Sequence, residues 1–185
     1  MNNTTDNFFG SEDYKIPDTS NYMKFIEGDN VFRALSSAIV GFVYFNTDNK
    51  PVRSKEVPES VPSDIQKDGN IKHFWAFIVW NENAKRVQLL EITQKSIMTT
   101  MQAYIKNAKW GSPKKYDFIV SKKGSGFDTE YAISVNPKAP LDESIAKKYL
   151  GMKINLDALF EGLDPFTAGL DPFKADHDPF TADKE

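Results

Sequence analysis

His73-Phe-Trp-Ala-Phe-Ile-Val-Trp80 is the most strand-like stretch of the chain. Aromatic and β-branched residues of this kind favour a pleated conformation. A polar run, Asn81-Glu-Asn-Ala-Lys85, follows it, and Arg86-Val-Gln-Leu-Leu-Glu-Ile92 reads as a returning strand. Two apolar runs joined by a short polar run predict a β-hairpin. This hairpin decides the fold, because the other predicted elements are arranged around it.

The segment before the hairpin predicts one long strand and one long loop. Residues 31–46 are rich in Val, Ile, Phe and Tyr and predict the strand, with Gly41 as the place for a bulge or bend. Residues 47–72 carry three prolines among charged residues and predict the loop. Long loops inside a compact domain are usually functional or disordered.

The segment after the hairpin predicts a helix, a second hairpin and short helical pieces. Thr93 is the expected N-cap of the helix, whose apolar face follows helical spacing through Ile97, Met101, Tyr104 and Ile105. Residues 116–120 and 128–135 predict the second hairpin, around a glycine-containing loop. A short helix over 141–150 and a turn capped by Asn155 are expected to follow.

The predicted order is therefore three strands, one helix and two strands. A five-stranded Greek-key barrel of the OB type, with its helix between strands 3 and 4, has this order. A parallel α/β sheet is disfavoured, because one helix cannot cover both of its faces. We predict an all-β OB-fold barrel over residues 22–156, a flexible leader over 1–21 and a disordered acidic tail over 157–185.

Charge is distributed unevenly along the 185 residues, whose net charge is −3. Residues 1–30 hold six acidic and two basic residues, and residues 157–185 hold eight acidic and two basic. The remaining 12 acidic and 19 basic residues give residues 31–156 a net charge of +7. A basic body attracts phosphate, whereas acidic ends compete for the same groove or recruit basic partners.

The C-terminal tail repeats the tripeptide Asp-Pro-Phe three times at a spacing of seven residues. Proline in each copy excludes a coiled coil, and so few apolar residues cannot build a core. Repeated short ligands raise the effective concentration at a partner. We therefore predict that the copies bind other proteins: Asp164, Pro165, Phe166, Asp171, Pro172, Phe173, Asp178, Pro179 and Phe180.

Composition argues against an enzyme, a metal or cofactor site and a membrane protein. The chain has no Cys and two His, one of them in the tail, and no phosphate-binding loop of the strand–GxxxxGK[ST]–helix type. No apolar run approaches the ~20 residues of a membrane span. We expect a non-enzymatic cytoplasmic protein without cofactors.

Five motifs in order carry a resemblance to a known family: Gly28-Asp-Asn-Val-Phe-Arg-Ala-Leu-Ser-Ser37, Lys50-Pro-Val-Arg-Ser-Lys55, His73-Phe-Trp-Ala-Phe-Ile-Val-Trp-Asn81, Leu90-Glu-Ile-Thr-Gln-Lys-Ser96, and Trp110-Gly-Ser-Pro113 followed by Tyr116-Asp-Phe118. They span roughly residues 22–141, and with them the chain resembles phage-type single-stranded DNA-binding proteins with one OB fold. The resemblance implies sequence-tolerant binding of single-stranded DNA (ssDNA) in the host cell cytoplasm. It also implies an acidic tail that docks replication or repair partners. This chain departs from the family pattern by ending in Asp183-Lys-Glu185 instead of near a terminal Phe.

A DNA groove needs cations for phosphates and flat rings for bases. If Trp80 pairs near Arg86, the outer face of the first hairpin carries Phe74, Trp80, Arg86 and Gln88. The loops flanking an OB groove add cations, and the first strand adds two side chains. The predicted ssDNA-binding residues are Arg33, Tyr44, Arg53, Lys55, Phe74, Trp80, Arg86, Gln88, Lys122 and Lys123. A one-residue bulge would exchange the faces and put Trp75 and Phe77 on the DNA side.

Two alternatives remain at this level. Repeated Asp-Pro-Phe is similar to the peptide ligands that endocytic accessory proteins offer to adaptor domains, which implies a scaffold that binds no nucleic acid. An OB module that binds only protein is the other. Self-association is open under each hypothesis.

Overall fold

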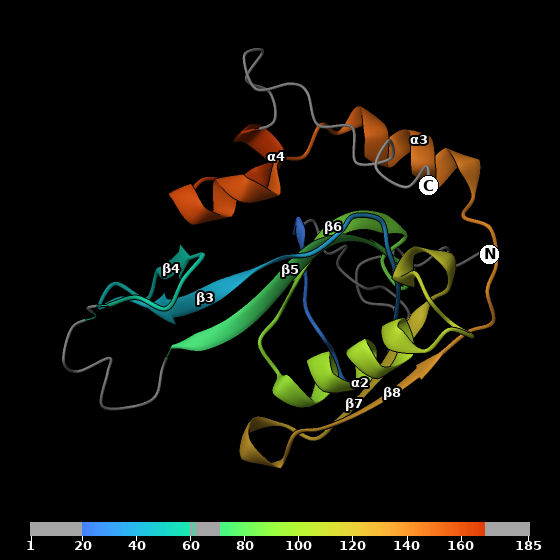
Figure 1. Ribbon diagram of the computed structural model, residues 1–185, viewed down its shortest axis with the longest axis horizontal. Coiled ribbons are helices and arrows are strands. Elements are labelled where there is room, and N and C mark those ends of the chain that lie inside the picture. The colour runs from blue at the N-terminus through green and yellow to red at the C-terminus, as the bar shows by residue number, and fades with distance from the viewer. Residues whose placement is uncertain (1–19, 60, 62–70, 169–185) are drawn as a thin grey trace, which may run out of the picture.

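The computed structural model of the chain describes residues 20–59, 61 and 71–168 (Figure 1). In chain order the elements are β1 (Tyr22–Met23), β2 (Gly28–Ala34), β3 (Ile39–Phe45), β4 (Pro51–Ser54), β5 (Lys72–Asn81), β6 (Arg86–Ile92), α2 (Lys95–Lys106), the 3-10 helix η1 (Pro113–Lys115), β7 (Phe118–Lys123), η2 (Gly126–Asp128), β8 (Glu130–Val135), α3 (Glu143–Gly151), η3 (Leu156–Glu161) and α4 (Pro165–Ala168).

The strands form one sheet with the order β1-β6-β5-β2-β7-β8, and β3 pairs with both β4 and β5. The two predicted hairpins are confirmed, because β5 pairs antiparallel with β6 and β7 with β8. The predicted place of the main helix is also confirmed, since α2 follows β6 and precedes β7.

The predicted closed all-β barrel is not what the structure shows. The fold is mixed α/β and is dominated by an open eight-stranded sheet; within the described residues no ladder joins β6 to β8. A physical reason lies at the edge of β6, where β1 pairs in parallel through Tyr22 opposite Leu89 and Met23 opposite Leu90. The edge that closure requires is therefore already occupied.

The single strand predicted over residues 31–46 is in fact two strands. β2 pairs with the C-terminal part of β5, and β3 pairs with its N-terminal part. Between them the Leu35 amide donates to the Ile78 carbonyl at 2.8 Å, and the Ser36 hydroxyl accepts from the Ile78 amide at 2.9 Å. These contacts satisfy the backbone of β5 where the ladder is interrupted. The predicted loop that follows also contains a strand, β4.

Both faces of β5 are buried, in two separate cores. One core lies between the sheet and α2 and includes Phe32, Phe77, Leu90, Ile97 and Phe118; the other includes Leu35, Phe74, Ile78, Leu89 and Leu159. Figure 1 shows α2 on one side of β5 and the C-terminal helices on the other. We call residues 143–168, which contain α3, η3 and α4, the C-terminal cover.

Helix ends agree only in part with the prediction. Gln94, not Thr93, is the N-cap of α2, and its side chain makes no capping hydrogen bond. Asn155 caps η3 as predicted, because its side chain accepts from the Asp157 amide. No helix in the described ranges is long and apolar enough to cross a membrane.

Candidate nucleic-acid interface

The register of the β5–β6 hairpin separates residues that we predicted to share a face. Trp80 pairs with Val87, and Arg86 pairs with Asn81, so the predicted register is wrong by one residue. Because successive side chains alternate between faces, Arg86 and Gln88 lie on the opposite face from Phe74 and Trp80.

The structure buries three of the predicted DNA-binding side chains. Phe74 and Gln88 are 0% exposed and Arg33 is 5% exposed. Gln88 donates to the Ser20 carbonyl at 2.7 Å and accepts from the Asn81 amide group at 2.7 Å. Neither Phe74 nor Gln88 has exposed surface that a phosphate or a base could contact.

Arg33 is held by a structural ion pair. Its Nε lies 2.6 Å from Asp117 Oδ1, and its Nη1 donates to the Ala139 carbonyl at 2.7 Å. Two of its donor groups are thus already used inside the protein. A nearly buried pair of this kind is broken only at high cost, so Arg33 positions β7 and the segment after β8.

Two predicted cations lie against the C-terminal cover or the sheet. Arg53 Nε donates to Glu91 Oε2 at 2.7 Å. Lys55 Nζ lies 3.6 Å from Asp157 Oδ1 and 5.4 Å from the centre of the Phe160 ring. Both groups of the Lys55–Asp157 pair are largely exposed, so this ion pair contributes little to stability. A carboxylate and an aromatic ring thus lie beside Lys55, where we expected a phosphate and a base.

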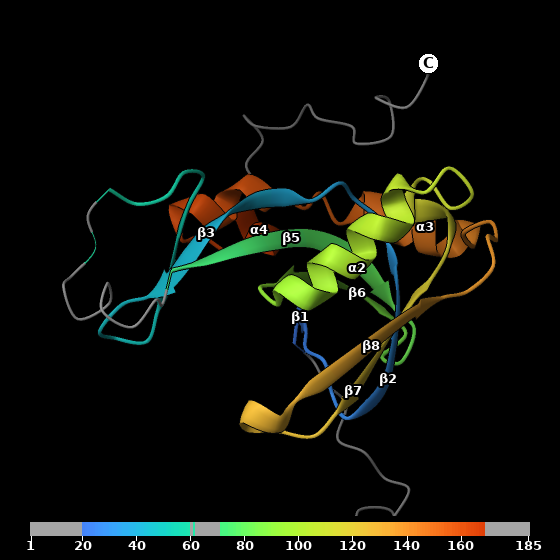
Figure 2. The same ribbon diagram turned by 60° about the horizontal axis from the view of Figure 1, so that its bottom comes forward.

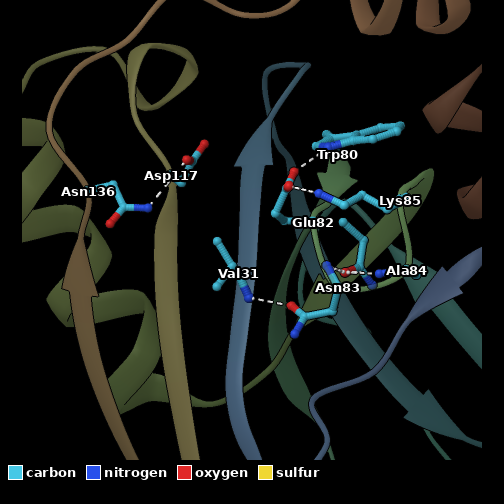
Figure 3. Close-up of polar contacts among 9 residues, drawn as sticks. Val31, Trp80, Glu82, Asn83, Ala84, Lys85, Asp117 and Asn136 are labelled. Carbon is cyan, nitrogen blue, oxygen red and sulfur yellow. Dashed lines mark hydrogen bonds and ion pairs between the residues drawn. The ribbon is translucent and has the colours of Figure 1, made fainter. Parts of the chain in front are cut away.

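Trp80 lies on the face of the sheet that the C-terminal cover packs against, which we call the covered face, and its side chain is held there by a hydrogen bond. Its Nε1 donates to Glu82 Oε2 at 2.7 Å, and Glu82 also contacts Lys85 (Figure 3). Lys148 of α3 places its Nζ 5.9 Å from the ring centre of Trp80. Lysine near an aromatic face is attracted by the ring quadrupole, so the cover also reaches Trp80.

The turn that carries Glu82 is itself anchored. Asn83 Oδ1 accepts from the Val31 amide at 2.8 Å, and Asn81 Oδ1 accepts from the amides of Asn83 and Ala84 (Figure 3). Asn136 donates to Asp117 in the same view, beyond β2. The bonds of Asn81 and Asn83 hold the turn that joins β5 to β6.

The remaining predicted cations lie away from the covered face. Arg86 is partly exposed at the start of β6. Lys122 is partly buried and its Nζ donates to the Phe25 carbonyl at 3.2 Å, whereas Lys123 is exposed at the end of β7. These two lysines are the last residues of β7, beside the turn of the β7–β8 hairpin and far in the sheet order from β4.

A different set of aromatic side chains is left partly exposed. Register places Phe42 opposite His73 and Val40 opposite Trp75, and Tyr44 lies two residues after Phe42 on the same face. We call Phe42, Tyr44, His73 and Trp75 the aromatic face. His73 is exposed and the other three are partly exposed, and the rings of Phe42 and His73 are 5.4 Å apart. Tyr44, one of the predicted DNA-binding residues, thus lies on the face opposite Phe74 and Trp80, because β3 runs through Gly41 in unbroken register.

The aromatic face lies on the α2 side of the sheet. Trp75 is opposite Ile92, which belongs to the core shared with α2. Figure 2 shows β3 and β5 as an extended arm, and the β7–β8 hairpin projects toward the same side of the molecule. Phe127 in η2, at the end of that hairpin, is fully exposed. Phe42, His73 and Phe127 are not among the predicted DNA-binding residues; a lone Phe in a Gly-Ser-Gly loop is the sequence signal for Phe127.

A groove of about 500 Å³ lies on the opposite face of the same arm. Phe45, which is 56% exposed, borders it. The other lining residues are Val43, Asn46, Asn49, Lys72, Glu91 and Thr93. The arm therefore has ring surface on both faces, with four aromatic side chains on the α2 side and one at the groove.

The first Asp-Pro-Phe copy is folded onto the body. Pro165 is buried, and Phe166 packs against the core that contains Phe74. Burial raises the pKa of Tyr22, the Arg53 charge opposes this, and the nearby carboxylate of Asp164 adds to it. Asp171, Pro172, Phe173, Asp178, Pro179 and Phe180 lie outside the described residues. The division into leader, body and tail stays a prediction, but residues 157–168 belong to the C-terminal cover and not to a disordered tail.

Within the described residues no group of three or more His, Cys, Asp or Glu side chains is placed to hold a metal ion.

Comparison with known proteins finds a relative of this chain. It is described as a probable ssDNA-binding protein of Escherichia phage T5 and is 26% identical over 143 residues, which cover 63% of this chain. The chain resembles a phage single-stranded DNA-binding protein. It spans about half of that relative, 55% of its length. No family model and no solved structure matches the chain.

Proposed function

We propose that this chain is a non-enzymatic, sequence-tolerant ssDNA-binding protein that acts in phage replication, recombination or repair. The observation that carries the proposal is the aromatic face, whose four rings lie on two adjacent strands and remain accessible. The phage T5 relative supports it, because its description names the same ligand.

The aromatic face has the chemistry that sequence-tolerant binding requires. Every base has a π-face, so a platform of rings accepts any sequence, and each stacked base contributes ~1–3 kcal/mol. Exposed lysines flank its strands in the sequence or lie on the hairpin that projects toward the same side (Figure 2): Lys50 between β3 and β4, Lys95 in the first turn of α2 after β6, and Lys123 at the end of β7. Lysines beside stacked bases can neutralise the phosphates between them.

The strand order supports the same ligand path. β6-β5-β2-β7-β8, with α2 between β6 and β7, is the order of an OB barrel that has opened between its third and fifth strands. In that scheme β3 and β4 belong to the connection between the first and second strands, and η2 to the connection between the fourth and fifth. These are the connections that flank nucleic acids in OB folds. We propose that ssDNA runs between them, past Tyr44, Lys122 and Lys123.

Recruitment of replication or repair proteins is the proposed role of the acidic C-terminal residues. The Asp-Pro-Phe copies beyond residue 168 repeat a short ligand, and repetition raises the effective concentration at a partner. The two functions then lie on separate parts of the chain.

Binding of labelled oligo-dT tests the proposal. We expect affinity to fall as salt rises, with a log–log slope of about −0.7 per phosphate neutralised. Tryptophan fluorescence should be quenched, because Trp75 belongs to the aromatic face. A duplex of the same length should bind more weakly, since its bases are not free to stack. Equal or tighter duplex binding, or no binding at low salt, would leave the protein-binding alternatives.

Tyr44→Ala and Phe42→Ala test the location of the interface. Each should weaken oligo-dT binding by about one stacked base, ~1–3 kcal/mol, while the melting temperature changes little. Phe45→Ala is the matched control, because Phe45 is the next residue of β3, is 56% exposed and points to the opposite face. If Phe45→Ala weakens binding and Tyr44→Ala does not, DNA binds on the groove side.

A further inference from the structure

The first Asp-Pro-Phe copy occupies a defined site on the body. The Asn155 amide donates to the Pro165 carbonyl at 3.0 Å, Pro165 is buried, and Phe166 packs against the Phe74 core. Gly162, with φ of 70°, turns the chain into this site, and the Leu163 amide donates to the Ala158 carbonyl at 3.0 Å. We call the body surface that receives this copy, around Asn155 and Leu159, the motif site.

The motif also folds itself. Asp164 Oδ1 accepts from the Phe166 amide at 3.0 Å, and the Asp164 carbonyl accepts from the Ala168 amide at 2.9 Å. Asp is thus the N-cap and Pro165 the first residue of a single helical turn, which suits a residue without an N–H donor. The tripeptide and its flanking residues therefore favour the bound conformation through their own local hydrogen bonds.

Two later segments repeat this ligand to different degrees. Residues 169–175 read Gly-Leu-Asp-Pro-Phe-Lys-Ala and differ from residues 162–168 only by Lys in place of the exposed Thr167. Residues 176–182 keep Asp-Pro-Phe but have Asp and His in place of Gly and Leu. A positive φ at the first position favours Gly over Asp.

We propose that the motif site is a receptor for Gly-Leu-Asp-Pro-Phe peptides, and that residues 169–175 of the same chain replace the first copy in it. The exchange conserves Gly, Leu, Asp, Pro, Phe and the final Ala, and it loses only the Thr167 hydroxyl, which donates to the Asp164 carbonyl at 3.2 Å. It extends the connection from η3 by seven residues, and the entropy of closing a loop grows only slowly with its length.

Because the two copies can exchange, binding of a partner to one copy does not by itself expose the surface under the C-terminal cover. A partner that takes one Gly-Leu-Asp-Pro-Phe copy leaves the other for the motif site, so the C-terminal cover stays in place. Only a partner that takes both copies, or two partners together, empties the site. This inference is independent of the proposed ssDNA binding.

Hydrogen exchange at the Asn155 amide reports occupancy, because that amide donates to Pro165. In the full chain we expect protection at Asn155 to survive Pro165→Ala with Phe166→Ala, and to survive Pro172→Ala with Phe173→Ala. With all four substitutions protection should be lost, and a synthetic Gly-Leu-Asp-Pro-Phe-Lys-Ala peptide should restore it. Loss of protection with the first pair alone, persistence with all four, or failure of the peptide would overturn the proposal. Protection of the first-pair variant that disappears on dilution would assign the occupant to a neighbouring chain and also overturn it.

Two deletions keep the test decisive if the fourfold variant does not fold. Deleting residues 162–168 places residues 169–175 directly after η3, and Asn155 protection and melting temperature should match the parent. Deleting residues 162–175 places Asp176 where Gly162 stood, and Asn155 should lose protection. Equal behaviour of the two deletions would show that the site does not recognise the glycine-containing motif. A loss in the first deletion would show that residues 169–175 do not fit.

Discussion

Phe74→Ala is expected to lower the free energy of unfolding by about 3–5 kcal/mol, the usual cost of removing a buried aromatic side chain. Phe74 is 0% exposed, and its ring lies 6.1 Å from that of Phe160 in η3. Thermal or denaturant unfolding followed by circular dichroism measures the change. Phe45→Ala is the control, and its effect should stay within about 0.5 kcal/mol because that ring is exposed.

The same substitution decides whether the cover is present in solution. If Phe74→Ala left the melting temperature unchanged and weakened oligo-dT binding, Phe74 would be a base platform and the cover would be displaced. Gly41 gives the structural reason to expect otherwise. A Cβ atom on Gly41 would lie 2.9 Å from Phe160 Cε1 and 2.4 Å from the Ser54 carbonyl oxygen. This close packing of β3, β4 and η3 leaves no room for a nucleotide.

The order of the elements was predictable because each has a local signal. Alternating apolar strands, the polar turn at residues 82–85 and the helical spacing of Ile97 and Met101 are readable without tertiary contacts. The break between β2 and β3 has no such signal. It depends on Leu35 and Ser36 bonding to Ile78, a residue more than forty positions away.

The site was less predictable than the fold for two reasons. Both faces of β5 carry apolar residues, so the sequence pattern does not show which face is exposed. A shift of one residue in the β5–β6 pairing decides which side chains of β6 share a face with Trp80. The cover supplied the second reason. Phe160 packs on the sheet where Gly41 has no side chain, and the Asn155 amide holds the Pro165 carbonyl next to Phe166. No pattern in the acidic tail reveals these contacts. We predicted that Tyr44 binds DNA together with Phe74 and Trp80, and the structure places it instead on the face that carries Phe42 and His73.

Arg33 and Gln88, two of the predicted DNA-binding residues, are buried for a physical reason. Both side chains are polar, and we therefore predicted that they face solvent and contact ssDNA. A buried polar group is tolerated when its hydrogen bonds are made within the protein. Arg33 meets that condition through Asp117, and Gln88 through Asn81 and Ser20.

Truncation at two points should separate the cover from the tail. A chain ending after Ala168 should keep the melting temperature of the parent, because it retains the whole C-terminal cover through α4. A chain ending after Leu156 loses the buried side chains of Ala158, Leu159 and Pro165. Removing a buried Leu side chain alone costs about 2–5 kcal/mol, so the free energy of unfolding should fall by at least that amount. Calorimetry of the two chains measures the difference.

The shorter truncation product should also expose an apolar face. Leu35, Phe74, Ile78 and Leu89 would lose their partners in the cover, and an exposed patch of this kind binds hydrophobic dyes and promotes aggregation. Asp157→Lys in the full chain is the control for charge alone: it reverses the contact with Lys55 but removes no buried side chain, so stability should change little. If the chain ending after Leu156 melts with the parent and binds no dye, the cover contributes nothing to the fold. The boundary of the folded body would then return to residue 156.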